Sequence, residues 1–99
     1  MAPRLQLHEL LGTFTDNVYF QPPTNVELKY PCIVYKRDFA ETEFADNAPY
    51  SRETRYMVTV IDRDPDSDIP GKVADMPKSV FNRFFTFGDL NHDVYNVFF

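Results

Sequence analysis

The eight residues from Arg55 to Asp62 constrain the fold of this chain more than any other segment. In an extended strand they form two alternating sets of side chains, and both sets are rich in apolar and β-branched residues. The first set is Tyr56, Val58 and Val60, and the second is Met57, Thr59 and Ile61. A strand that is apolar on both faces is typical of a sheet interior, where both faces are covered. The segment therefore predicts the central strand of a sheet.

The rest of the chain predicts an α+β domain in which helices pack on a mainly antiparallel sheet. With 99 residues, positions 1–99 have room for a single domain. Apolar spacing from Leu7 to Phe14 predicts a short N-terminal helix that ends near Gly12, and a short second helix is predicted to be opened by Pro70 and closed by Pro77. The other strands are predicted at 17–20, 32–35, 80–87 and 93–99, the last two joined by a five-residue loop over 88–92, and 21–31 is interpreted as a connector.

A long β-hairpin extension is predicted between the strands at 32–35 and 55–62, with a polar tip near 46–49. The segment Asp38–Tyr50 contains no Lys or Arg, which makes it the most one-sided charge run in the chain. Its acidic residues are Asp38, Glu41, Glu43 and Asp46. Three interpretations stay open for them: a solvated face, a surface that keeps DNA from binding, or an imitation of DNA phosphates.

The C-terminal segment is unusually rich in aromatic residues, because the last nineteen residues hold six of the ten phenylalanines. These six are Phe81, Phe84, Phe85, Phe87, Phe98 and Phe99. Strand alternation predicts that Phe81 shares one face with Phe85 and Phe87, and that Phe84 lies on the opposite face. Either the hairpin has a core on both sides, or at least one aromatic face contacts a neighbouring subunit.

The alternating aspartates of residues 62–68 are similar at first sight to a calcium-binding loop. The register fails, because a loop that starts at Asp62 has Ser67 where glycine is required and Val73 where a bidentate acid is required. We therefore expect a solvated turn, in which Ser67 or Asp68 caps the helix that follows.

Enzymatic chemistry is not expected from this sequence. His8 and His92 stand in no catalytic motif, and Cys32 lies in an apolar run, where burial blunts the reactivity of a thiol. The three glycines are scattered, so the sequence has no phosphate-binding loop. The sequence thus predicts neither an enzyme nor a protein with a cofactor or a bound metal.

Charge and hydropathy limit the partners that the chain can have. A formal net charge of −5 disfavours tight binding to the phosphates of DNA. No apolar run approaches the roughly 18 residues that a membrane span needs, and the N-terminus lacks the apolar stretch of a signal peptide. We expect a soluble, unexported chain that folds in a reducing compartment, because a single cysteine cannot form an intramolecular disulfide.

Four stretches of the sequence together resemble a known family. They are 17–23 (NVYFQPP), 30–35 (YPCIVY), 56–70, and 90–95 (LNHDVY). In combination they look like the small tail completion, or tail terminator, proteins of tailed bacteriophages and prophages. The resemblance spans nearly the whole chain and rests on strands and turns, since the family has no catalytic signature to match.

The resemblance implies a structural virion protein. It implies an α+β subunit that assembles, commonly as a hexamer, into a ring that caps the tail tube at the head–tail junction in the neck. Its partners would be the tail tube protein and a head-completion or connector protein, DNA would pass through the lumen without specific binding, and the chain would be made in the cytoplasm of the bacterial host. Carried to this sequence, the lumen-facing acids would be Asp38, Glu41, Glu43 and Asp46, and the aromatic strands would contact neighbouring subunits.

Two alternatives remain beside the tail terminator. A head-completion or connector ring would belong to the same assembly and would use the same kinds of surface. A monomeric acidic inhibitor that mimics DNA would instead act as a binding module, and it would need carboxylates spread in rows over one face.

Overall fold

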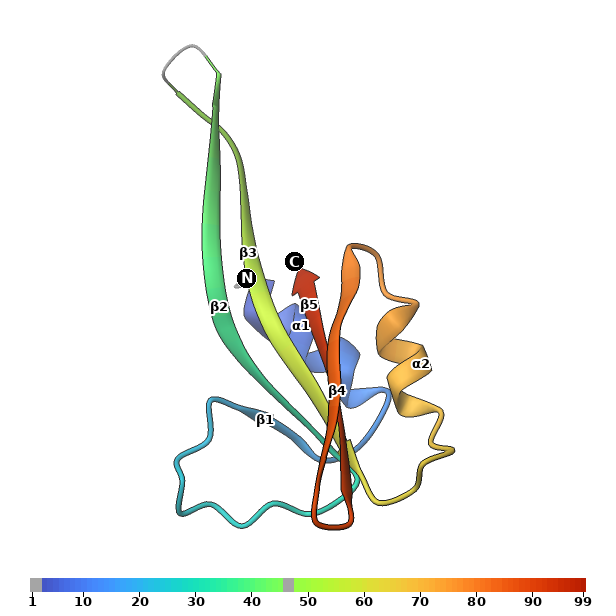
Figure 1. The fold of residues 1–99 in the computed structure, drawn as a ribbon. Helices are drawn as coiled ribbons and strands as arrows, with labels where there is room; N and C mark the ends of the chain where they lie inside the picture. The colour runs from blue at the N-terminus through green and yellow to red at the C-terminus, as the bar shows by residue number, and fades with distance from the viewer. Residues whose placement is uncertain (1–2, 46–47) are drawn as a thin grey trace.

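The computed structural model describes residues 3–45 and 48–99, and the side chains of 4–38 and 54–99. Two helices and one five-stranded sheet make up the described chain (Figure 1). In chain order the elements are α1 (Pro3–Gly12), β1 (Val18–Phe20), β2 (Cys32–Ala45), β3 (Ala48–Asp62), α2 (Ile69–Ala74), β4 (Ser79–Phe87) and β5 (Leu90–Phe98). The strand order is β1-β2-β3-β5-β4, and only the β1–β2 pair is parallel within this sheet. The predicted α+β fold with a mainly antiparallel sheet is confirmed.

β3 is the central strand, as the sequence predicts, because it pairs with β2 on one side and β5 on the other. Its side chains Tyr56, Val58 and Val60 are buried on the face that carries both helices. The helices cover this face with apolar residues spaced three or four apart, which are Leu7 and Leu11 from α1, and Ile69, Val73 and Met76 from α2 and its end. In Figure 1, α1 lies behind β3 and β5, and α2 lies beside β4.

Polar contacts with Tyr35 join α1 to the sheet. Tyr35 of β2 is fully buried, and its hydroxyl lies 2.7 Å from Nδ1 of His8. The Tyr35 ring also packs on Phe20 at a centroid distance of 4.9 Å and on Tyr56 at 6.1 Å. Because a buried hydroxyl without a partner is costly, this hydrogen bond fixes where α1 lies on the sheet.

The long hairpin extension is present. β2 and β3 pair from Cys32 opposite Ile61 to Ala45 opposite Ala48, whereas β5 pairs with β3 only from Arg55 onward. Residues 39–45 and 48–54 therefore form a two-stranded arm, which rises beyond the sheet in Figure 1. The arm gives the molecule its elongated extents of 51 × 25 × 22 Å. Residues 46 and 47 of the predicted tip lie outside the described residues.

The predicted loop over 88–92 is wrong. β4 and β5 are joined by Gly88 and Asp89 alone, since Phe87 already pairs with Leu90. Gly88 has a φ of +63°, which suits a two-residue hairpin turn with glycine in its first central position. The polar residues next to this turn read as loop in the sequence, but they continue the β5 ladder between β3 and β4.

The tight turn makes a prediction for substitution of Gly88. We expect Gly88→Ala to lower the free energy of unfolding by about 1–2 kcal/mol, because a residue with a Cβ is strained at positive φ. An added Cβ would meet no atom within 4 Å at Gly88 or at Gly12, and only Gly88 has a positive φ. Gly12→Ala is thus the matched control, with a change within about 0.5 kcal/mol or a small gain. Urea unfolding measures both, and equal values would contradict the tight turn.

Candidate functional site

The β4 strand leaves an aromatic surface uncovered. β4 is the last strand in the sheet order, and every residue from Val80 to Phe87 is exposed. The exposed fractions of its phenylalanines are 55% for Phe81, 53% for Phe84, 39% for Phe85 and 77% for Phe87. A long, apolar edge strand exposes unpaired backbone groups and apolar side chains with which another chain can pair. We call these four residues the β4 aromatic strip.

The strip has two faces, but the predicted division between them is wrong. Phe81 pairs with Tyr95 and Arg83 pairs with Val94, so Asn82 is an extra residue in a β-bulge. The bulge reverses the alternation, which places Phe81 and Phe84 on the helix-bearing side of the sheet. Phe85 and Phe87 lie on the opposite side. A bulge has no strong signal in a single sequence, and for this reason simple alternation failed here.

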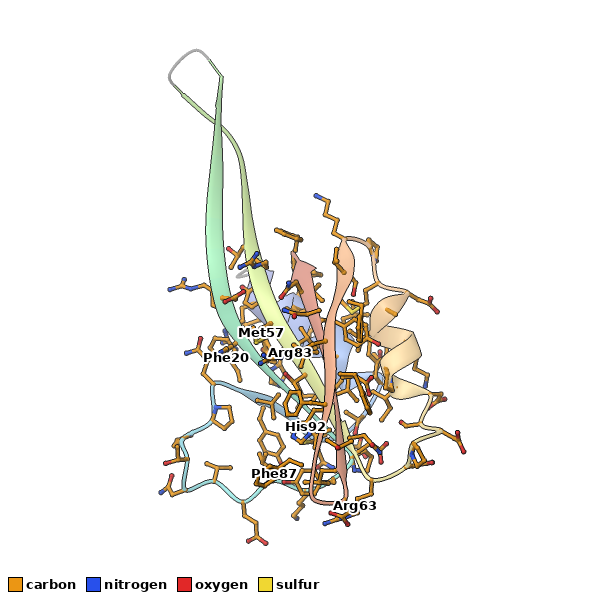
Figure 2. The ribbon with its side chains drawn as sticks, in the orientation of Figure 1. Phe20, Met57, Arg63, Arg83, Phe87 and His92 are labelled. Atoms are coloured by element: carbon orange, nitrogen blue, oxygen red, sulfur yellow. The ribbon has the colours of Figure 1, made fainter. Side chains whose placement is uncertain are left out.

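Each face of the strip is fixed by contacts with β5. On the helix-bearing side, Phe81 meets Tyr95 edge to face, at a centroid distance of 5.5 Å. On the other side, the rings of Phe85 and His92 stack 4.5 Å apart, with an angle of 13° between their planes. The guanidinium of Arg83 lies 5.4 Å from the centre of the Phe85 ring, and Figure 2 shows Arg83, His92 and Phe87 along this hairpin.

The last two phenylalanines differ from the strip. Phe98 is half-buried, and its amide donates to the carbonyl of Lys78 at 3.1 Å. Phe99 is 37% exposed, and its amide donates to the carbonyl of Thr54 at 3.1 Å. Both residues are therefore held at the base of the arm, at the opposite end of β5 from the Gly88 turn.

The acidic run of the arm is partly compensated. Asp38 sits in a β-bulge, because Arg37 pairs with Tyr56 and Phe39 pairs with Arg55. Both Nε and Nη2 of Arg55 lie 2.9 Å from Oδ2 of Asp38. Arg55 lies beyond the acidic run in sequence, and only strand pairing brings it to Asp38. Of the proposed lumen acids, Asp38 is thus held in an ion pair.

The other proposed lumen acids are placed by backbone register alone. Glu41 pairs with Glu53, and Glu43 pairs with Ser51. The side chains of Glu41 and Glu43 lie outside the described part of the structure, as does the whole of Asp46. The register adds Glu53 to the acidic positions of the arm, an acid that the sequence analysis did not single out.

The aspartate turn is stabilised by its own backbone. Oδ1 of Asp62 accepts a hydrogen bond from the amide of Asp64 at 2.9 Å, and Oδ1 of Asp64 accepts one from Asp66 at the same distance. Asp68 occupies the N-cap position of α2 without a side-chain cap bond, while Oγ of Ser67 accepts from the amide of Ile69 at 3.3 Å. Among the described residues, no group of three His, Cys, Asp or Glu side chains is arranged to hold a metal ion.

Two pockets lie on the helix-bearing side of the sheet. One, of about 160 Å³, lies at the β4 edge and is lined by Asp62, Asp64, Pro65, Ser67, Pro70, Phe84, Asn91 and Asp93. Partial burial raises the pKa of Asp93, and the nearby His92 lowers it by a smaller amount. The other, of about 350 Å³, lies towards β1 and is lined by Arg4, Phe20, Gln21, Arg37 and Tyr56. Each pocket combines residues from separate elements, so sequence reasoning missed both.

No protein-family model matches this sequence, and a search of curated proteins finds no similar one. Within residues 3–45 and 48–99, no helix has the length and apolar character needed to cross a membrane.

The buried thiol of Cys32 makes a prediction for chemical modification. Burial raises the pKa of Cys32 to about 11, with a smaller contribution from the carboxylate of Asp62. The thiolate is the reactive form, so alkylation by iodoacetamide at pH 8 is expected to be about a hundredfold slower in the folded protein than in urea. Mass spectrometry of timed samples measures both rates. A folded rate within threefold of the unfolded rate would contradict an inert core thiol.

Proposed function

We propose that this chain is a structural subunit that assembles with copies of itself into a ring. The observation that carries the proposal is the β4 aromatic strip, four exposed phenylalanines on an open sheet edge. Fully burying one such side chain is worth roughly 1.5–3 kcal/mol, so covering the strip would supply much of an association energy. A ring requires a contact between two different surfaces that closes on itself, and a sheet with two unlike edges provides such surfaces.

The resemblance to tail completion proteins supports a specific place for this ring. In this proposal the ring, with six copies, caps the tail tube of a phage at the head–tail junction and contacts the tube protein and a connector protein. The subunit would be made in the bacterial cytoplasm and incorporated in the virion. The acidic arm would face the lumen through Glu41, Glu43 and Asp46, where negative charge lets DNA pass without holding its phosphates. Asp38 would instead brace the arm through Arg55.

The described ion pairs favour a structural ring over a DNA mimic. A mimic needs carboxylates spread in rows over one face, whereas Asp38, Asp68 and Asp89 each pair with a basic residue. The carboxylates of Asp62, Asp64 and Asp93 are gathered at one pocket and form no such rows. A head-completion or connector ring would fit the same surfaces, and locating the protein along the neck by immunolabelling in electron microscopy distinguishes it from a terminator.

The aromatic strip gives the first test. The triple variant Phe81→Ser, Phe84→Ser and Phe87→Ser removes three exposed side chains, and we expect it to abolish assembly. The free energy of unfolding of the monomer should change by less than about 1 kcal/mol per site, because exposed side chains contribute little to a folded monomer. Light scattering after gel filtration, over a range of concentrations, measures the mass.

Val26→Ser is the matched control for this test, since Val26 is an exposed apolar residue of the 21–31 connector and is not part of β4. It should assemble like the unaltered protein. An unaltered chain that stays monomeric at high concentration, or a triple variant that assembles normally, would contradict the proposal.

The acidic arm gives the second test. Changing Glu41, Glu43 and Asp46 together to Lys should leave the fold and the ring intact but reduce infectivity at least tenfold, because a basic lumen would hold DNA phosphates. Complementation of a phage that lacks the gene measures infectivity, and circular dichroism checks the fold. Unchanged infectivity would contradict the lumen role and leave the ring itself supported.

A further inference from the structure

Two arginines converge on the pocket towards β1. Arg4 comes from α1 and Arg37 from β2, and the aromatic residues Phe20 and Tyr56 complete most of its wall. The guanidinium carbon of Arg4 lies 4.6 Å from the centre of the Phe20 ring. A cation held against an aromatic face is oriented without losing its charge, and the side chain of Arg4 also forms a hydrogen bond with Tyr35. We call this cavity the arginine pocket.

The arginine pocket has positive charge that the described part of the chain does not compensate. Neither Arg4 nor Arg37 has a carboxylate partner among the described side chains. Asp38 is adjacent to Arg37 in sequence, but its carboxylate is bound to Arg55. Two like charges beside apolar rings repel each other, and an anionic group placed between them would remove this cost. The planar guanidinium suits a carboxylate in particular.

The complementary charge lies at the other edge of the same sheet. Asp64 and Asp66 are exposed in the turn between β3 and α2, and Asp64 also lines the pocket at the β4 edge. This second pocket adds Asp62 and Asp93, and the described structure shows no ion pair for either. Figure 1 shows the turn at the foot of α2, towards the β4 edge of the sheet, whereas β1 lies at the other edge.

Both surfaces lie on the helix-bearing side of the sheet. Tyr56, at the arginine pocket, shares the buried face of β3 with Val60, and Val60 pairs with Asp93 at the acidic pocket. One chain therefore presents a positive surface near β1 and a negative surface near β4, at opposite edges of a sheet whose twist turns those edges in different directions. Such a pair cannot meet within one molecule, whereas a head-to-tail arrangement of copies would bring it together.

We propose that the arginine pocket binds the aspartate turn of the neighbouring copy, with Arg37 opposite Asp64. This inference rests on the ring of the proposed function and names the polar part of its subunit contact. Phe84 lines the same pocket as Asp64, so the contact would cover the helix-bearing face of the β4 aromatic strip as well. Charge complementarity at the rim of an apolar contact mainly fixes its register and partner choice.

Charge reversal on each side tests the contact. Arg37→Glu and Asp64→Arg are each expected to raise the concentration needed for half assembly at least tenfold in low salt. Combining them in one chain restores opposite charges across the contact, so the double variant should assemble within threefold of the unaltered protein. Sedimentation velocity over a concentration series measures assembly, and thermal unfolding checks that each variant folds.

Two exposed residues serve as matched controls. Lys36→Glu makes the same charge change one position earlier on β2, where the side chain faces the opposite side of the sheet. Asp16→Arg makes the same charge change as Asp64→Arg in the loop between α1 and β1, and Asp16 lines neither pocket. Both controls should assemble like the unaltered protein. Should Arg37→Glu unfold, Arg37→Gln removes the charge with a milder change and should weaken assembly by a smaller factor.

The outcomes separate this inference from the proposed function. If the unaltered chain assembles and Arg37→Glu assembles equally well, the arginine contact is wrong and the ring stands. If the double variant is as weak as the worse single variant, the pairing of Arg37 with Asp64 is wrong. If the unaltered chain stays monomeric throughout, both are wrong. An ionic contact would be supported if 0.5 M salt raised the concentration needed for half assembly of the unaltered protein but changed it little for the two single variants.

Discussion

Burial of β3 beneath the two helices is the constraint on which the rest of the structure depends. Tyr56, Val58 and Val60 form the middle of the core, and both helices contribute to the same cluster. The described part of this 99-residue chain has two short helices, and both pack on the same face of the sheet. The opposite face receives no helix, and α2 lies beside β4 without covering its aromatic side chains, so these residues remain exposed.

Two polar contacts help to position α1 and the β2–β3 arm relative to this core. The hydrogen bond between His8 and Tyr35 holds α1 over β2, and the ion pair between Asp38 and Arg55 lies where the arm departs from the sheet. A two-stranded ribbon is marginally stable alone, so a contact at its base has a large effect on its direction. The bulge at Asp38 and the Arg55 fork together brace the arm as a projection of the sheet.

The sequence was sufficient for the elements whose periodicity is strong and local. The central position of β3, the short α2 that begins next to Pro70 and ends before Pro77, and the long hairpin all follow from apolar alternation and turn residues. The Gly88 turn was misjudged because Asn91 and His92 are polar, although their neighbours in β3 and β4 keep them in the ladder. The bulge at Asn82 and both pockets depend on contacts between distant segments, which a single sequence does not specify.

An exposed aromatic edge strand is also a hazard, since any extended chain could pair with it. Two features of this molecule reduce that hazard while leaving a specific contact possible. The net charge of −5 repels other copies at long range, and the bulge at Asn82 interrupts the regular edge of β4. In the proposed contact, attraction would require an orientation that brings the arginine pocket to the aspartate turn, where local charges oppose the overall repulsion. In the proposed ring, aromatic burial would supply the energy of the contact, and the separated charges would select the one arrangement of copies that closes.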